Sequence, residues 1–161
     1  MAYHGLDVYL NDHLAGATAG VNLAQMAAEE HRSDELGAFF GEIASDVRAD
    51  HDALERMMDA LNTDRSATKV AAAEIGSKFM APKFTGTEDD LNAFVTLETL
   101  SIGVEGKHCL WTALKTVEDG NPALAEFDID DLISRAREQR SRIEAKRLEM
   151  APQALAHTVA A

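Results

Sequence analysis

Residues 89–117 read DDLNAFVTLETLSIGVEGKHCLWTALKTV, and this stretch decides the fold. A helix that advances about 100° per residue gathers one set of its apolar residues into a stripe, namely Leu91, Phe94, Val95, Ile102, Cys109 and Ala113. Glu98 and Glu105 are one heptad apart and fall in the middle of this stripe. Because an unpaired carboxylate is costly to bury, we expect another helix to bring a cation, a donor or a metal to them.

Length and charge limit the classes of protein to which the chain can belong. Its 161 residues suit one domain, which we place at residues 1–152 with a flexible tail at 153–161. Its net charge of −13 disfavours nucleic acid and anionic membranes as partners. No apolar run has membrane-spanning length, the N-terminus does not follow a signal-peptide pattern, and the one cysteine, Cys109, cannot form an internal disulfide. We therefore expect a soluble cytoplasmic protein.

Three further amphipathic helices are expected around the central one. The first covers about residues 6–31, and the second, about 34–61, begins after the N-cap residues Ser33 and Asp34. The connection between them is very short, so they should form an antiparallel hairpin. The last helix covers about residues 130–150, and Pro152 should end it.

The connection from residue 62 to residue 88 is long for a compact domain, and residues 66–78 could form a short amphipathic helix within it. If this segment carries the chain back along the molecule, the second and third helices run parallel. The expected fold is therefore an all-α four-helix bundle made of two antiparallel hairpins joined by a long crossover.

Several polar residues on inward faces should meet at one height of such a bundle. Counting outward from the hairpin turns at equal rise places His13 level with Asp50 and His51, and the parallel second and third helices bring Glu105 to the same tier. Gln139 on the last helix should lie within about one turn of them, and His108 lies one turn from Glu105. Glu98 lies roughly 10 Å along the axis from Glu105, so it would belong to a second polar layer.

The helix order, the long crossover and these inward acids and histidines resemble the ferritin-like superfamily, and within it the small bacterial bundles, stress-associated or without an assigned role, rather than the cage-forming ferritins. Members with a di-iron or di-manganese site place a Glu on two helices and a Glu-x-x-His on the other two. Here only Glu105-Gly-Lys-His108 has that spacing. The first helix offers His13 where the family has Glu, and the last helix offers Gln139 and no suitable histidine.

Two interpretations of this tier remain open. In the first, His13, His51 and Glu105, with Asp50 and His108, bind iron, manganese or zinc, for redox chemistry or for sequestration without turnover. In the second, a histidine donates a hydrogen bond to Glu105 and Asp50, Gln139 completes the network, and the layer fixes the helix register. Arg135 and Arg147 lie close enough to the stripe of the last helix to reach inward.

A third hypothesis is a binding or assembly module without a reaction. Apolar residues outside the central stripe exceed what one bundle can cover, and a homodimer could bury them: Leu97, Leu100, Val104, Leu110, Trp111 and Leu114. Alternatively, the crossover helix covers them through Val70, Ile75 and Phe79. No phosphate-binding loop, nucleophile elbow or paired-cysteine motif identifies a small-molecule substrate or an enzyme class.

Overall fold

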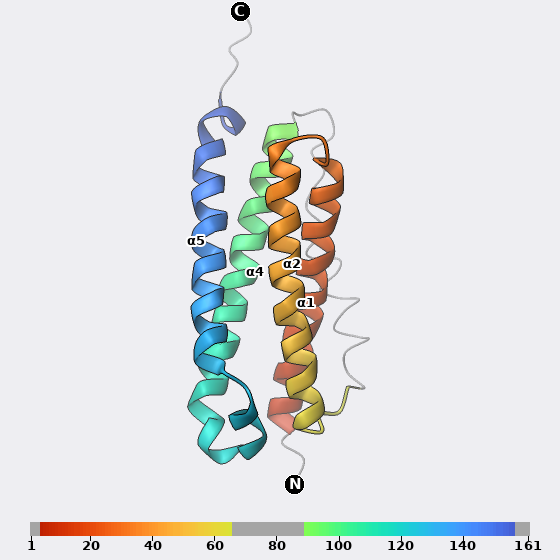
Figure 1. Cartoon of the computed structure of the whole chain (residues 1–161), viewed down its shortest axis with the longest axis vertical. Helices are drawn as coiled ribbons and strands as arrows, with labels where there is room; N and C mark the ends of the chain where they lie inside the picture. The colour runs from red at the N-terminus through yellow and green to blue at the C-terminus, as the bar shows by residue number, and fades with distance from the viewer. Residues whose placement is uncertain (1–3, 66–88, 157–161) are drawn as a thin grey trace, which may run out of the picture.

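A computed structural model of the chain describes residues 4–65 and 89–156, which are almost entirely helical and contain no strand. Four long helices account for most of them (Figure 1): α1 is His4–Glu30, α2 is Glu35–Ala60, α4 is Asp89–Val117 and α5 is Ile129–Ala154. Two short 3₁₀ helices, η1 at Glu118–Gly120 and η2 at Pro122–Glu126, connect α4 to α5. The expected all-helical fold is confirmed for these residues, and each long helix begins and ends within a few residues of its prediction.

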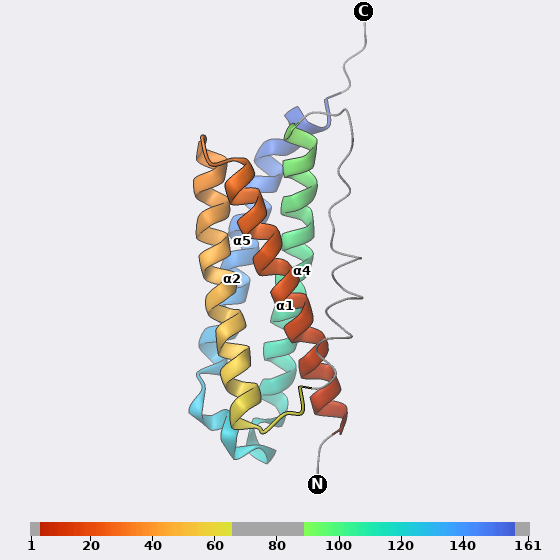
Figure 2. The ribbon, with the colours of Figure 1, turned by 90° about the vertical axis from the view of Figure 1, so that its right-hand side faces the viewer.

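The four helices lie side by side. The pairs α1 with α2 and α4 with α5 are hairpins and make the most contacts, and fewer contacts join α1 to α4 and α2 to α5. In Figures 1 and 2, α2 and α4 both run from the upper end of the molecule to the lower end. The end of α2 and the start of α4 therefore lie at opposite ends. The expected helix at 66–78, with Val70, Ile75 and Phe79, falls outside the described residues.

The turn between α1 and α2 is held by local polar contacts. Asp34 is the N-cap of α2, and its Oδ1 accepts hydrogen bonds from the backbone nitrogens of Leu36 and Gly37. Gly37 is buried against the turn, where an added Cβ would lie 2.0 Å from the carbonyl oxygen of His31. The expected cap is confirmed, and this close approach explains why a glycine stands in the first turn.

The buried face of α4 differs from the stripe that we expected. Its buried residues are mainly the apolar residues outside the expected stripe, together with some of their neighbours. They are Ala93, Phe94, Thr96, Leu97, Leu100, Ser101, Val104, Leu110, Trp111 and Leu114. Glu98, Glu105, Ile102 and Cys109 are exposed, so the predictions that the two glutamates are buried and that Cys109 is a core residue are wrong. Apolar residues occur on nearly every side of α4, and solvation of the glutamates decides which side faces water.

Leu97, Leu100, Val104, Leu110, Trp111 and Leu114 are each no more than 3% exposed and belong to the chain's own core. They leave no surplus surface for a second copy to cover, so the reason given for a homodimer is lost.

The end of α5 also differs from the prediction. The helix continues past Pro152 to Ala154, which is buried, while residues 157–161 fall outside the described part. A proline this close to a helix end removes only one late hydrogen bond. In the described residues, no helix is both long and apolar enough to cross a bilayer.

Candidate functional site

A buried carboxylate on α2 is the centre of a polar cluster between α2, α4 and α5. Asp50 is 1% exposed. Its Oδ2 accepts a hydrogen bond of 2.6 Å from Lys107 Nζ and one of 2.9 Å from Gln139 Nε2. Lys107 Nζ also donates to Gln139 Oε1, so the three side chains form a closed triangle. Asp50 and Gln139 meet at one height, as we expected.

A second cation reaches the same carboxylate from α5. Arg135 Nη2 lies 2.7 Å from Asp50 Oδ1, as an ion pair without hydrogen-bond geometry. The other terminal nitrogen of Arg135 lies 4.0 Å from Asp131 at the surface. The prediction that Arg135 reaches inward is confirmed. One buried anion is thus shared by two cations.

The surroundings of Lys107 change how easily its ammonium loses a proton. Its side chain is 13% exposed, and burial is the main cause that lowers its pKa below the ordinary value for lysine. Asp50 opposes this shift, while the positive charge of Arg135 adds to it. Its ammonium is therefore more acidic than that of an exposed lysine.

A cavity of about 350 Å³ lies between α1, α2 and α4, next to this cluster. Most of its lining is apolar or glycine: Gly16, Ala17, Gly20, Leu23, Val47, Leu54, Leu100, Ile102, Gly103, Val104, Gly106, Leu110 and Trp111. Its polar lining residues are Asp12, His13, Asp50, His51, Thr99 and Lys107. Asp12, Ile102 and Gly103 are exposed, so the cavity reaches the surface between α1 and α4.

Two aromatic residues that line the cavity, His13 and Trp111, carry polar ring nitrogens. His13 packs edge-to-face against Tyr9 with 4.5 Å between ring centroids, and burial lowers its pKa, so its neutral form is favoured. Trp111 is 1% exposed, and its indole nitrogen, Nε1, has no hydrogen-bond partner in the described part of the chain. A buried N–H without an acceptor is costly, and the surrounding side chains close this one off from solvent.

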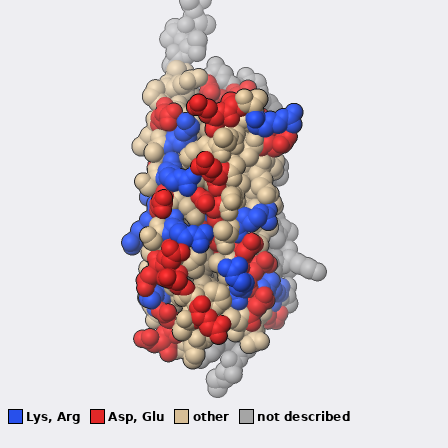
Figure 3. Space-filling model, viewed as in Figure 1, with Lys and Arg blue, Asp and Glu red and all other residues tan. Residues whose placement is uncertain are grey.

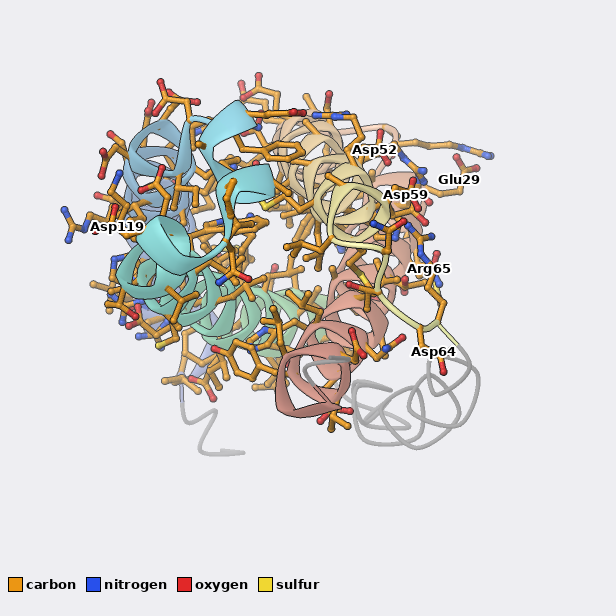
Figure 4. The ribbon with its side chains drawn as sticks, turned by 90° about the horizontal axis from the view of Figure 1, so that it is seen from below. Glu29, Asp52, Asp59, Asp64, Arg65 and Asp119 are labelled. Carbon is orange, nitrogen blue, oxygen red and sulfur yellow. The ribbon has the colours of Figure 1, made fainter. Side chains whose placement is uncertain are left out.

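His51 turns its two ring nitrogens in different directions. Nε2 lies 3.2 Å from Thr18 Oγ1 on α1, while Nδ1 lies 3.2 Å from Asp52 and 3.9 Å from Glu55. Ligand atoms of His51, Asp52 and Glu55 come within 4.8 Å of one another, the one such group among the described residues. Arg65 also pairs with Glu55 and with Asp59, and Figure 4 shows Arg65 close to Asp59 at the lower end of α2.

The structure brings together only part of the expected metal-binding set. His13, Asp50 and His51 line one cavity, with Gln139 behind Asp50. By contrast, Glu105 pairs with Arg140 at 3.1 Å on the exposed side of α4 and α5.

The remaining two expected donors are also paired on that exposed side. His108 accepts a hydrogen bond from Arg137 Nε, and its Nδ1 lies 3.8 Å from Glu105. Glu98 pairs with Arg147 at 3.3 Å. The donors needed for a buried metal centre therefore do not converge, and its one buried carboxylate already holds two cations.

Lys107 is the central residue that the sequence-based prediction overlooked. It lies inside the Glu105-Gly-Lys-His108 segment, where the family spacing draws attention to the residues on either side. The helical period, however, places Lys107 on the same face as Leu100, Val104, Trp111 and Leu114. A lysine within the more continuous apolar stripe was the available signal for a buried cation.

Comparisons of the chain with known protein families, curated proteins and solved structures found no match.

Proposed function

We propose that this chain is a ferritin-like four-helix bundle that binds a small, mostly apolar molecule in the cavity between α1, α2 and α4. The buried cluster around Asp50 is then a structural layer. Support for the bundle comes from the helix order and from the parallel course of α2 and α4. The observation that carries the binding proposal is the cavity of about 350 Å³, which lies at the small end of the range for ligand sites.

The lining predicts the character of the ligand. Ligand sites combine apolar walls with a few polar groups that fix orientation, and here His13 and Lys107 are the candidates for that role. Four glycines, Gly16, Gly20, Gly103 and Gly106, keep the wall open, because an added Cβ at any of them meets no atom within 4 Å. A flat or slender apolar molecule with one acceptor oxygen suits this space.

Fluorescence of Trp111 tests the proposal directly, because it is the only tryptophan in the chain and lines the cavity. Cinnamyl alcohol, which is flat, apolar and carries one hydroxyl, serves as the probe. We expect saturable quenching or a spectral shift of Trp111 as the probe is added. Gly103→Leu and Gly16→Leu, which fill the cavity from opposite helices, should remove that response.

Gly41→Leu is the matched control. Gly41 lies on α2 outside this cavity, and an added Cβ there also meets no atom within 4 Å. Its response to cinnamyl alcohol should equal that of the wild type. Circular dichroism confirms that each variant folds. An unsaturable response, or one that survives in both cavity-filled variants, rejects binding in this cavity.

A second candidate function is divalent metal binding at the surface group formed by His51, Asp52 and Glu55. One imidazole and two carboxylates suit zinc, manganese or iron. Arg65 competes for Glu55, so we expect weak affinity. Calorimetric titration with Zn²⁺ or Mn²⁺ tests this candidate: Asp52→Asn should abolish the binding heat, and Glu105→Gln should leave it unchanged.

A further inference from the structure

Lys107 is the one lysine among the residues that line the apolar cavity. Its Nζ donates to Asp50 Oδ2 and to Gln139 Oε1, which are its two hydrogen-bond partners among the described residues. A neutral amine has two N–H donors, so both of these contacts can persist when the ammonium loses a proton. The third position on the nitrogen is then a lone pair, which makes the group a nucleophile.

The positive charge of Arg135 also eases the loss of a proton from this ammonium, while the charge of Asp50 opposes it. With Lys107 neutral, Asp50 on α2 and Arg135 on α5 form a balanced buried pair; with Lys107 protonated, the same cluster carries one excess positive charge. Asp46 on α2 raises the pKa of Lys107 slightly, whereas burial and Arg135 lower it. His13 of α1 also lines the cavity, and burial lowers its pKa.

We propose that Lys107 condenses reversibly with an apolar aldehyde bound in this cavity and forms an imine. This inference rests on the proposed ligand-binding function and names its ligand class. The apolar walls hold the carbon skeleton of the aldehyde in the cavity that Lys107 lines. Lys107 and Trp111 are four residues apart on α4, so both side chains project from the same face of the helix.

The reaction balances without an oxidant or a reductant. The amine nitrogen attacks the carbonyl carbon, a C–N bond forms, and the C=O π electrons move to oxygen. One amine proton then passes to that oxygen, which gives a carbinolamine. The second amine proton leaves with the hydroxyl group as water while the C=N bond forms. Asp50 Oδ2 accepts a hydrogen bond from Lys107 Nζ and is therefore positioned to relay these protons.

Reductive trapping tests the proposal. The protein is incubated at neutral pH with trans-cinnamaldehyde and sodium cyanoborohydride, and the product is analysed by intact mass and peptide mapping. We expect one reduced adduct per chain, located at Lys107, and a loss of roughly tenfold or more in the Lys107→Arg variant. Lys115→Arg is the matched control, because hydrogen bonds to Glu118 and Asp130 raise the pKa of that exposed amine.

Peptide mapping and the cinnamyl alcohol titration distinguish the other possible outcomes. Peptide mapping of the wild type locates the adduct even if Lys107→Arg does not fold. Adducts spread over surface lysines, or equal labelling of Lys107→Arg, overturn the proposal. The cinnamyl alcohol titration separates the two levels of inference: if the alcohol binds but the aldehyde leaves no adduct at Lys107, the imine is rejected and ligand binding stands. If neither compound binds, both are rejected.

Discussion

Asp50 is a nearly fully buried carboxylate on which Lys107, Arg135 and Gln139 converge from two other helices. Burying ions is costly unless they are paired, and removing the shared partner leaves the others uncompensated. The single anion is therefore more important to this cluster than either cation. This asymmetry leads to a prediction about substitutions.

Asp50→Ala should lower the free energy of unfolding by about 3–5 kcal/mol, because two cations lose their buried partner. Lys107→Met should cost less, because Arg135 still neutralises Asp50. Urea denaturation followed by circular dichroism measures both changes. The exposed neighbour Asp52 provides the control, and Asp52→Ala should stay within about 0.5 kcal/mol of the wild type. If Lys107→Met costs as much as Asp50→Ala, the described sharing of charge is wrong.

Glu144 on α5 predicts a pH dependence of stability. Hydrogen bonds from Arg147, then from Ser101, lower its pKa from the ordinary 4.5 to about 2. A carboxyl whose pKa is lower in the folded state stabilises the fold above its unfolded pKa, and this contribution disappears as the pH falls through the folded pKa. Glu144→Gln should therefore be less stable than the wild type at pH 6.

The stability difference caused by Glu144→Gln should shrink between about pH 4.5 and about pH 2. Thermal unfolding at a series of pH values measures it. Glu149, which is exposed and pairs with Lys146, provides a control: Glu149→Gln should have a small effect throughout. A difference for Glu144→Gln that is constant down to pH 2 would show that its carboxylate charge is not the cause.

At the scale of elements, the α1–α2 hairpin depends on one glycine. A Cβ on Gly37 would lie 2.0 Å from the carbonyl oxygen of His31, whereas one on Gly41, a turn later on the same helix, meets nothing within 4 Å. Gly37→Ala should therefore destabilise the protein by about 1–3 kcal/mol. Gly41→Ala should stabilise it by about 0.5–1 kcal/mol through helix propensity. Paired urea unfolding curves test this, and equal effects would contradict the close packing of the turn.

The helices could be predicted from sequence, but the orientation of α4 could not. The helical period indicates where the long helices lie along the chain, and the Asp34 cap with the short connection before it indicates the start of α2. Two apolar stripes compete on α4, one containing Glu98 and Glu105 and the other containing Lys107. Choosing between them requires knowing which neighbour supplies a counter-charge, and Asp50 is 57 residues away from Lys107 in the chain.

Part of the candidate site could also be predicted from the sequence. The meeting of Asp50 with Gln139 follows from counting helical rise outward from two turns, and the structure confirms it. The cavity could not be predicted, because it is a space that several glycines on two helices leave between α1 and α4, and a sequence pattern does not report such a space.

At the scale of the whole molecule, several arginines of α5 pair with acidic residues of the neighbouring helices. Arg142 pairs with Glu42 and Asp46 of α2, and Arg140 and Arg147 pair with glutamates of α4. Figure 3 shows acidic and basic side chains intermixed over one face of the molecule. Although each exposed pair contributes little, together they favour this placement of α5 over its alternatives.

The same internal pairing bears on the metal dependence of the whole protein. Because Lys107 and Arg135 already pair with Asp50, we expect the packing of the four helices to need no metal ion. We expect excess chelator to leave the thermal midpoint of the protein unchanged within about 1 °C, whereas a structural metal would lower it by many degrees. Elemental analysis of protein purified without chelators or affinity metals gives the second readout. Metal at the surface group should fall in Asp52→Asn and persist in Glu105→Ala. Stoichiometric metal that disappears in Glu105→Ala, with a large chelator-induced fall in the midpoint, would instead establish a metal centre that includes Glu105 and overturn the structural role given to the Asp50 cluster.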